Sequence, residues 1–355
     1  MQRAAPTWSP PAPRPRTTHG PAWLLAALVL LALLLAVRLG AVAVRWEDWQ
    51  SVLTLTEGQP LSGGAYVLWN IRLPRALFAI LVGAALGLSG ALTQGLFRNP
   101  LADPGLLGVS SGAACAAALS IVVLASLEWQ LPMAWRLWLL PTAAFAGALG
   151  VCGALNQLAR WLTPGSISGL LLTGVALNAL AASVIGLCTY LATDEQLRSL
   201  SFWTLGALTS GTWWLVAVMA VLVTVAAWQV RRLVHAMNAL ALGESAASHV
   251  GIDVRHLRRH IIVLVAVLAG FSVAWCGMIG FIGLIAPHLV RTWLGPDQRL
   301  VAPLSMLMGA LLLLCADTLA RTVAIPAEVP VGIFTALLGA PFFLLLLRSS
   351  RGQLT

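Results

Sequence analysis

Long apolar runs alternate with short polar stretches along the chain after its first twenty residues. The runs lie at 22–44, 74–97, 106–127, 135–159, 168–191, 211–230, 258–277, 279–294, 300–320 and 331–347. Most of them approach the roughly 20 residues that a helix needs to cross a hydrocarbon core about 30 Å thick. The pattern therefore predicts an all-α integral membrane protein with about ten transmembrane helices, of which the run at 279–294 is the shortest.

Composition agrees with the pattern. Hydrophobic residues make up 59% of the 355 residues and charged residues only 9%, and the mean hydropathy is +0.89. Such a chain has too little polar surface to cover a soluble globule of this size. The net charge of +9 could indicate nucleic acid, but the arginines lie at the ends of apolar runs and form no basic, aromatic-laced face.

The arginines instead predict an orientation. If the N-terminus is cytoplasmic, 14 of the 21 basic residues fall in inner regions and 7 in outer ones, as the positive-inside rule requires. Both termini are then expected in the cytoplasm. We expect residues 1–20, rich in Pro and Arg, to form a disordered tail and residues 21–355 to form one membrane domain. Because the apolar core at 22–44 is longer than that of a signal peptide, a retained first helix is favoured over a cleaved one.

Three connections are longer than the others. The outer stretch 45–71 is rich in tryptophan, and the second helix is expected to begin after it, at residues 71–75. The outer stretch 192–210 could include a short interfacial helix at 201–206. The inner stretch 231–260 is charged and able to form a helix, so a soluble partner is expected to dock there.

A polar turn broken by prolines, at 98–108, separates two apolar runs. Non-helical backbone beside a bilayer is tolerated only where protein or a water-filled cavity satisfies its polar groups, so this turn is expected to belong to a pathway. Glycines recur at helical spacing, as at Gly83, Gly87 and Gly90. Small residues at such intervals let helices approach closely, and packing within the chain is favoured over a role in lining the substrate path.

A series of motifs follows between about residue 70 and residue 348. They are Arg72-Leu73-Pro74-Arg75, the helix from Gly83 to Gln94, Arg98-Asn99-Pro100-Leu101-Ala102-Asp103-Pro104, Leu242-Gly243-Glu244, Gly280-Phe281-Ile282-Gly283-Leu284-Ile285-Ala286-Pro287-His288-Leu289-Val290-Arg291, and Pro330-Val331-Gly332 with Leu338-Gly339-Ala340-Pro341. In order and spacing they resemble the permease subunits of the iron-siderophore, haem and vitamin B12 ABC importers. Met278 and Ala327 depart from the residues common in that family.

The resemblance implies a subunit of ten helices in the bacterial cytoplasmic (inner) membrane. It implies that this subunit pairs with a second permease, identical or different, to enclose a translocation path for a ferric siderophore or a related metal chelate such as haem or cobalamin. Two cytoplasmic ATPase subunits, which bind ATP and Mg, and an extracytoplasmic binding protein are the other implied partners. No cofactor is expected on this chain.

The resemblance also implies roles for particular residues. The outer arginines Arg72, Arg75 and Arg321 match residues that dock the binding protein, since guanidinium groups pair well with carboxylates; anchoring at helix ends and an i,i+4 pair of Arg321 with Asp317 are the plain alternatives. The residues implied in ATPase coupling are Leu242, Gly243, Glu244, Ala247 and Gly251. Those implied in a cytoplasmic gate are Asn99, Leu101, Ile167 and Ser168.

Other classes of function fit the sequence less well. The chain has no phosphate-binding P-loop and no lysine, so it cannot hydrolyse ATP by that route, and no catalytic site is expected. A metal site is not expected either, because His288 stands alone and the five cysteines form no CxxC pair. An ion-driven secondary transporter would favour charged groups near the bilayer midplane, where the apolar runs offer only Asp317 as an acid, towards an outer end.

Overall fold

The structure is a computed structural model and describes residues 19–54, 62–123 and 132–349. These residues form helices and no strand. The elements are α1 (His19–Arg38), α2 (Trp46–Thr54), α3 (Gly63–Tyr66), the π-helical turn η1 (Val67–Arg72), α4 (Leu73–Phe97), the 3₁₀ turn η2 (Pro104–Leu107), α5 (Val109–Val122), α7 (Met133–Leu162), α8 (Ile167–Leu191), α9 (Asp194–Leu205), α10 (Trp213–Ala241), α11 (Glu244–His249), α12 (Val254–Cys276), α13 (Ile282–Leu294), α14 (Gln298–Thr322) and α15 (Val331–Ser349).

Every one of the ten predicted apolar runs contains a helix, which confirms the all-α prediction. Seven of the described helical spans are long and apolar enough to cross a membrane by length and composition. Two of the remaining helices are short, α5 with 14 residues and α13 with 13. The number of ten crossings therefore stays a prediction.

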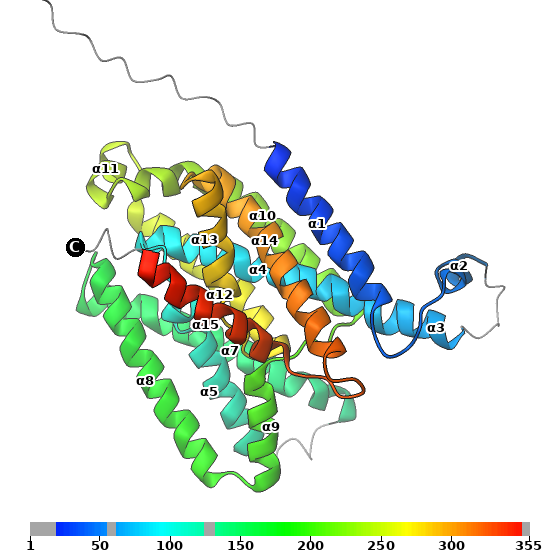
Figure 1. The fold of residues 1–355 in the computed structure, drawn as a ribbon. Helices are drawn as coiled ribbons and strands as arrows, with labels where there is room; N and C mark the ends of the chain where they lie inside the picture. The colour runs from blue at the N-terminus through cyan, green and yellow to red at the C-terminus, as the bar shows by residue number, and fades with distance from the viewer. Residues whose placement is uncertain (1–18, 55–61, 124–131, 350–355) are drawn as a thin grey trace, which may run out of the picture.

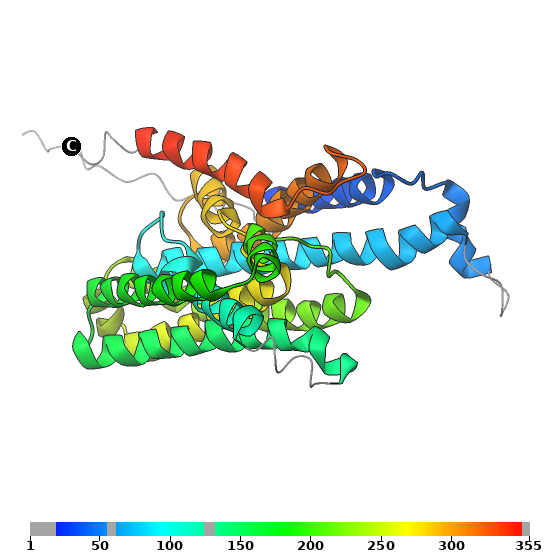
Figure 2. The same ribbon diagram turned by 90° about the horizontal axis from the view of Figure 1, so that it is seen from below.

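Helix α4 is the central element of the fold. Figure 2 shows it running between α1, α14 and α15 on one side and α7 and α10 on the other. Its closest neighbour is α14, where Gly83 lies against the backbone of Gly309 and Gly87 against that of Ser305. A Cβ atom at either α4 glycine would collide with that backbone, so the two helices can approach as closely as small residues allow. This confirms the predicted packing role of these glycines.

The second predicted helix begins earlier than expected. It was placed at residues 71–75, but the chain is already helical at Gly63 and continues without a break to Phe97. Pro74 has no N–H to donate, and a proline ring clashes with the carbonyl four residues earlier in a regular helix. The wider π-helical turn η1 precedes this proline, with the Leu73 N–H donating five residues back to Leu68. The helix thereby accommodates Pro74 instead of starting there.

Other boundaries also differ from the prediction. The helix at the start of the membrane domain begins at His19, and residues 1–18 of the predicted tail lie outside the described residues. The eighth run becomes helical only at Ile282, because Gly277 and Phe281 both have a φ of +67°. The short outer helix expected at 201–206 is the end of the longer α9.

The inner stretch 231–260 is not one helix. It comprises the end of α10, the short α11 and the start of α12. Figure 1 shows α11 on the same side of the molecule as the start of α1 and the end of α15, whereas α2, α3 and α9 lie at the opposite side. The two described ends thus share the side of α11, and the assignment of that side to the cytoplasm stays a prediction.

Candidate functional site

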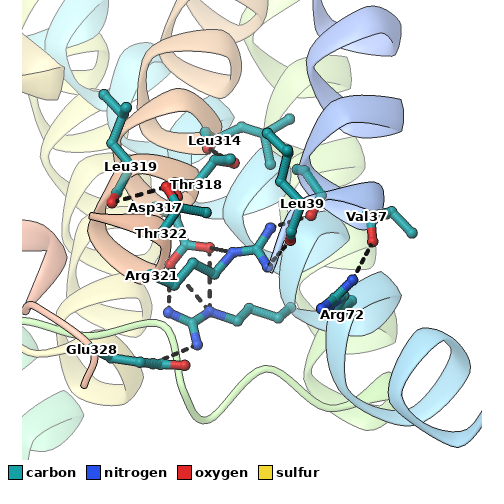
Figure 3. Close-up of polar contacts among 12 residues, drawn as sticks. Val37, Leu39, Arg72, Leu314, Asp317, Thr318, Leu319, Arg321, Thr322 and Glu328 are labelled. Atoms are coloured by element: carbon teal, nitrogen blue, oxygen red, sulfur yellow. Dashed lines mark hydrogen bonds and ion pairs between the residues drawn. The ribbon is translucent and has the colours of Figure 1, made fainter. Parts of the chain in front are cut away.

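An ionic cluster joins α4 to α14 at the side of the molecule that carries α2, α3 and α9, the predicted outer side (Figure 3). The Arg75 guanidinium donates to both carboxylate oxygens of Asp317, with a shortest distance of 2.8 Å, and its Nη1 lies 2.8 Å from Glu328 Oε2. Arg321 Nε lies 3.5 Å from Asp317 Oδ2. Asp317 is fully buried, while the Glu328 side chain is 46% exposed. The two guanidinium groups and the two carboxylates therefore balance in charge, and the buried Asp317 contacts both arginines.

Two of the outer arginines also bind the end of α1. Arg72 donates to the carbonyls of Val37, at 3.1 Å, and Val42, at 2.6 Å, and also to that of Arg38. Arg321 donates to the carbonyls of Ala36 and Leu39. The last four carbonyls of a helix have no partner within it, and positive charge is favoured at that end by the helix dipole. Arg72 and Arg321 thus cap α1 and attach it to the rest of the fold.

The structure brings together all three predicted docking arginines. Arg72, Arg75 and Arg321 are only 5%, 8% and 9% exposed, and their guanidinium groups donate to partners in this chain. The i,i+4 pair of Arg321 with Asp317, one of the alternatives, is present. Sequence reasoning missed Glu328 and the pairing of Arg75 with Asp317. The lone acid of an apolar run was the available signal, because a buried carboxylate requires a positive partner.

The polar turn before α5 is satisfied by protein, as its position beside the membrane requires. Asn99 Oδ1 accepts from Leu101 N at 2.9 Å, and Asp103 Oδ1 accepts from Gly105 N at 2.7 Å. Burial raises the pKa of the Asp103 carboxyl, and the bond from Gly105 acts in the opposite direction.

Side chains from two other helices complete this turn. Cys152 on α7 donates to the Leu107 carbonyl at 3.2 Å, and Asn178 on α8 donates to the Gly105 carbonyl at 3.4 Å. The Asn178 Oδ1 accepts from Ser111 Oγ at 2.6 Å. Sequence reasoning missed Asn178, although a lone amide in an apolar run was a usable signal.

Two of the four predicted gate residues, Asn99 and Leu101, lie in the turn between α4 and η2, and the other two, Ile167 and Ser168, begin α8. Asn99 and Ser168 are exposed, whereas Leu101 and Ile167 are partly buried. Ile167 begins α8, whose first turn is capped by Ser166 Oγ accepting from Gly169 N at 3.0 Å. Both turns are thus held in place by side-chain caps, with one apolar and one polar predicted gate residue in each.

The predicted coupling residues surround α11. Gly243 and Gly251 bound this helix with φ values of +120° and +83°, which residues with a Cβ rarely adopt. Ala247, on α11, is fully buried, whereas Leu242, just before the helix, is 82% exposed. Glu244 accepts from Arg258 of α12 at 2.8 Å. The arrangement presents an apolar side chain just before a short helix that contacts the rest of the domain through an ion pair and a buried methyl group.

The adjacent loop anchors the start of α12. Asp253 Oδ1 accepts from His256 N at 3.0 Å, and this bond holds the pKa of Asp253 below its usual value. Arg258, the ion-pair partner of Glu244, was missed by sequence reasoning, since charged residues on an inner loop are usually solvated. Fourteen residues separate the pair, and only the turn at Gly251 brings them together.

The described residues contain no group of three or more His, Cys, Asp or Glu side chains that could hold a metal ion. His288, the one histidine considered as a ligand, lies on α13 with its ring edge against Phe342 at 5.8 Å between centroids. Its Nε2 is 3.3 Å from the Thr292 hydroxyl. These contacts are those of a packed histidine.

Comparisons with known proteins cover almost the whole chain. Residues 28–349 match the model of the FecCD transport family. The hemin transport system permease protein HmuU of Yersinia pestis is 43% identical over 345 residues, covering 96% of this chain and 98% of that protein. The vitamin B12 import system permease protein BtuC of Salmonella arizonae is 41% identical over 332 residues, covering 93% and 95%.

Similar solved structures agree with this family match. A metal-chelate type ABC transporter in an inward-facing conformation has a TM-score of 0.78 and 31% identity, covering 92% of this chain and 98% of that chain. PsaBC from Streptococcus pneumoniae, at 17% identity and a TM-score of 0.53, shares the fold. The α4–α14 core, the capped inner turns and the Gly-bounded α11 thus stand in a chain that belongs to the FecCD transport family and is a membrane permease subunit of an ABC transporter.

Proposed function

We propose that this subunit belongs to an ATP-driven importer of haem or a related metal chelate, in the cytoplasmic membrane of a bacterium. The observation that carries the proposal is the 43% identity to a hemin permease over 96% of the chain. The similarity to a vitamin B12 permease and to a metal-chelate type transporter supports the wider class of substrate. Ferric siderophores belong to the same chemical class of large metal-centred ligands.

Energy for transport enters through α11 and the residues that flank it. Leu242 and Val250, 82% and 68% exposed, are apolar side chains next to the two ends of this helix, and apolar helix surfaces of this kind fit grooves on partner proteins. The Glu244–Arg258 pair transmits movement of α11 to α12. The partners that receive the helix are two ATPase subunits, which hold ATP and Mg.

The binding protein docks at the outer side, around Arg72, Arg75 and Arg321. Because these arginines are buried, they act from beneath the surface: Arg75 fixes the half-exposed Glu328, and Arg72 and Arg321 fix the end of α1. Exposed Val323 and Ile325 lie in the same outer loop as Glu328. A rigid outer surface is what a docking protein requires, since binding to a preorganised site costs less ordering entropy.

A second permease subunit completes the translocation path. A groove of about 620 Å³ runs along α15, between α9 and the non-helical residues 278–281. Exposed backbone at membrane depth is tolerated only beside protein or a water-filled cavity, so this face is suited to a path enclosed by two subunits. The inner turns that carry Asn99, Leu101, Ile167 and Ser168 close the path at the cytoplasmic end.

The ion-driven alternative loses its best candidate residue. Asp317, the only acid in the apolar runs, is bound by Arg75 and lies next to Arg321. A carboxylate neutralised in this way is not available to bind and release a transported ion.

Uptake by proteoliposomes tests the proposal. The complete transporter, reconstituted with its ATPase and binding protein, should accumulate haem, cobalamin or a ferric siderophore only when ATP is supplied. Omission of the ATPase should abolish accumulation, and an imposed proton or sodium gradient should not restore it. Gradient-driven accumulation by this chain alone would overturn the proposal, as would ATP-driven uptake limited to ligands that contain no metal.

A further inference from the structure

A cavity on the inner half of the molecule is separate from the groove along α15. It has a volume of about 640 Å³ and lies between α1, α10 and α14, three helices labelled together in Figure 1. Leu88 of the central α4 lines it, as do Ala227 on α10 and Met306 and Leu307 on α14. Such a volume falls within the range of sites that bind small molecules, and most of the lining is apolar.

The rim of this cavity is basic. Arg231 and His235 come from α10, one turn apart, and Arg299 comes from the start of α14. Arg299 Nη2 lies 3.0 Å from His235 Nδ1. A guanidinium can only donate, so His235 accepts at Nδ1 and its Nε2 carries the remaining proton. The rim therefore offers two guanidinium groups and one imidazole N–H.

The positive charge of this rim is not neutralised within the described residues. Neither Arg231 nor Arg299 forms an ion pair with a carboxylate there. The nearest acid along the chain, Asp297, accepts at Oδ1 from Asn238 Nδ2 at 2.7 Å and from the Arg299 backbone N at 2.9 Å. Asp297 does not line the cavity.

The depth of the rim matches a membrane surface. Helix α10 carries no charge and, apart from Thr224 and Gln229, is apolar from Trp213 to Val230, a length of about 27 Å at 1.5 Å per residue, close to the thickness of the hydrocarbon core. Arg231 directly follows that stretch. The exposed Trp228 lies three residues before Arg231 on α10, and the exposed Trp23 follows Ala22, which lines the cavity; tryptophan commonly marks the membrane interface. The basic groups thus lie where lipid headgroups lie, and the apolar lining lies where acyl chains lie.

We propose that this cavity binds an anionic phospholipid, with its phosphate on Arg231, His235 and Arg299 and an acyl chain against Leu88, Ala227, Met306 and Leu307. Basic pockets between transmembrane helices on the cytoplasmic side are suited to anionic headgroups. The bound lipid contacts both α1 and α10 and so links these two helices. This lipid site goes beyond the proposed function, because no step of chelate transport requires the lipid.

Charge argues against two other occupants. The first twenty residues hold three arginines and no acid, so a basic rim repels that segment. A second copy of this chain, placed on the same face by a two-fold axis, would bring two basic rims together. A negatively charged ligand with an apolar tail satisfies both the rim and the lining.

Native mass spectrometry of the purified transporter tests the site. Phosphatidylglycerol is titrated against phosphatidylcholine with the same acyl chains, and inorganic phosphate is added as a competitor. The double variant Arg231→Gln/Arg299→Gln should lower the affinity for phosphatidylglycerol by about thirtyfold, from the contribution expected of two basic residues at an anionic surface. The expected preference for phosphatidylglycerol over phosphatidylcholine should disappear with it.

The chain provides matched controls. Arg232 is the next residue on α10 and loses the same charge in Arg232→Gln, but its guanidinium stacks on Trp228 at 3.8 Å from the ring centroid and does not line the cavity; this variant should keep the affinity. Ala227→Phe fills the apolar part and should weaken retention of phosphatidylglycerol without removing a charge.

Each contrary result overturns the assignment. The lipid site is wrong if both lipids bind equally to the unaltered protein, or if Arg232→Gln lowers the affinity as much as the double variant does. Displacement of phosphatidylglycerol by millimolar inorganic phosphate alone would show a simple anion site. Loss of a subunit contact in the double variant, with lipid binding unchanged, would assign the cavity to a second copy.

Discussion

The outer arginine cluster and the inner helix α11 use charge in opposite ways. At the outer side Arg75 and Arg321 surround an acid with no exposure, and Arg72 binds the end of α1. At the inner side the ion pair of Glu244 on α11 with Arg258 on α12 is partly exposed. Buried charges are costly to separate, whereas exposed pairs contribute little to stability. The outer cluster therefore holds the fold, and α11 can move with a partner.

The largest effect on stability is expected from Asp317→Asn. This change leaves Arg75 and Arg321 buried without their shared carboxylate and should reduce the free energy of unfolding by about 3–5 kcal/mol. The thermal unfolding of the purified protein in detergent measures it. Glu328→Gln is the matched control, because the same arginine loses a half-exposed partner and the cost should stay below about 1 kcal/mol. Equal losses in the two variants would contradict a structural role for the buried pair.

A smaller loss is expected from Arg72→Met, which keeps the apolar stem and removes the donors to the carbonyls of Val37 and Arg38 at the end of α1 and of Val42 beyond it. Unsatisfied buried carbonyls and a lost cap should cost about 2–3 kcal/mol. Proteolysis or hydrogen exchange of α1 should report the loss locally. Arg38→Met, which removes an exposed charge from the same helix end, is the control. Unchanged protection of α1 in Arg72→Met would contradict the capping role.

At the inner side we expect coupling, and not folding, to fail. Gly243→Pro requires a φ near −65° in place of +120°, with strain of about 1–3 kcal/mol confined to the ends of α10 and α11. ATP hydrolysis should continue without substrate accumulation, measured as substrate imported per ATP hydrolysed. Ser245→Ala, on the exposed surface of α11, is the control. Normal uptake by the proline variant would remove the coupling assignment.

The smallest effect is expected from Glu244→Gln, which breaks the pair with Arg258. Its cost to stability should be about 0.2–1 kcal/mol, within reach of a careful unfolding measurement and reduced by added salt. The amount of substrate imported per ATP hydrolysed should fall by more than the small loss of stability accounts for, because the pair links α11 to α12. A variant with reduced stability and unaltered coupling would place the pair with the outer cluster, as a structural contact only.

Local sequence predicted more of the fold than of the candidate site. Each of the ten apolar runs contains a helix, because the length and hydropathy that a membrane requires are local properties. Helix starts were less accurate, as at Gly63 and Ile282, where a π-helical turn and two positive φ values move the boundary. Gly243 and Gly251, which the sequence placed in the coupling segment, have positive φ values at the two ends of α11, a conformation that selects glycine.

The sequence by itself determined that this protein lies in a membrane and that its helices pack through glycines. Only the tertiary structure decided which charges meet. Arg75 and Asp317 are separated by 242 positions, and nothing in local spacing pairs them; the close approach of α4 and α14 does. A helix is specified by hydrogen bonds and apolar contacts among near neighbours, but the partner of a buried charge is whichever opposite charge the packed helices bring within reach.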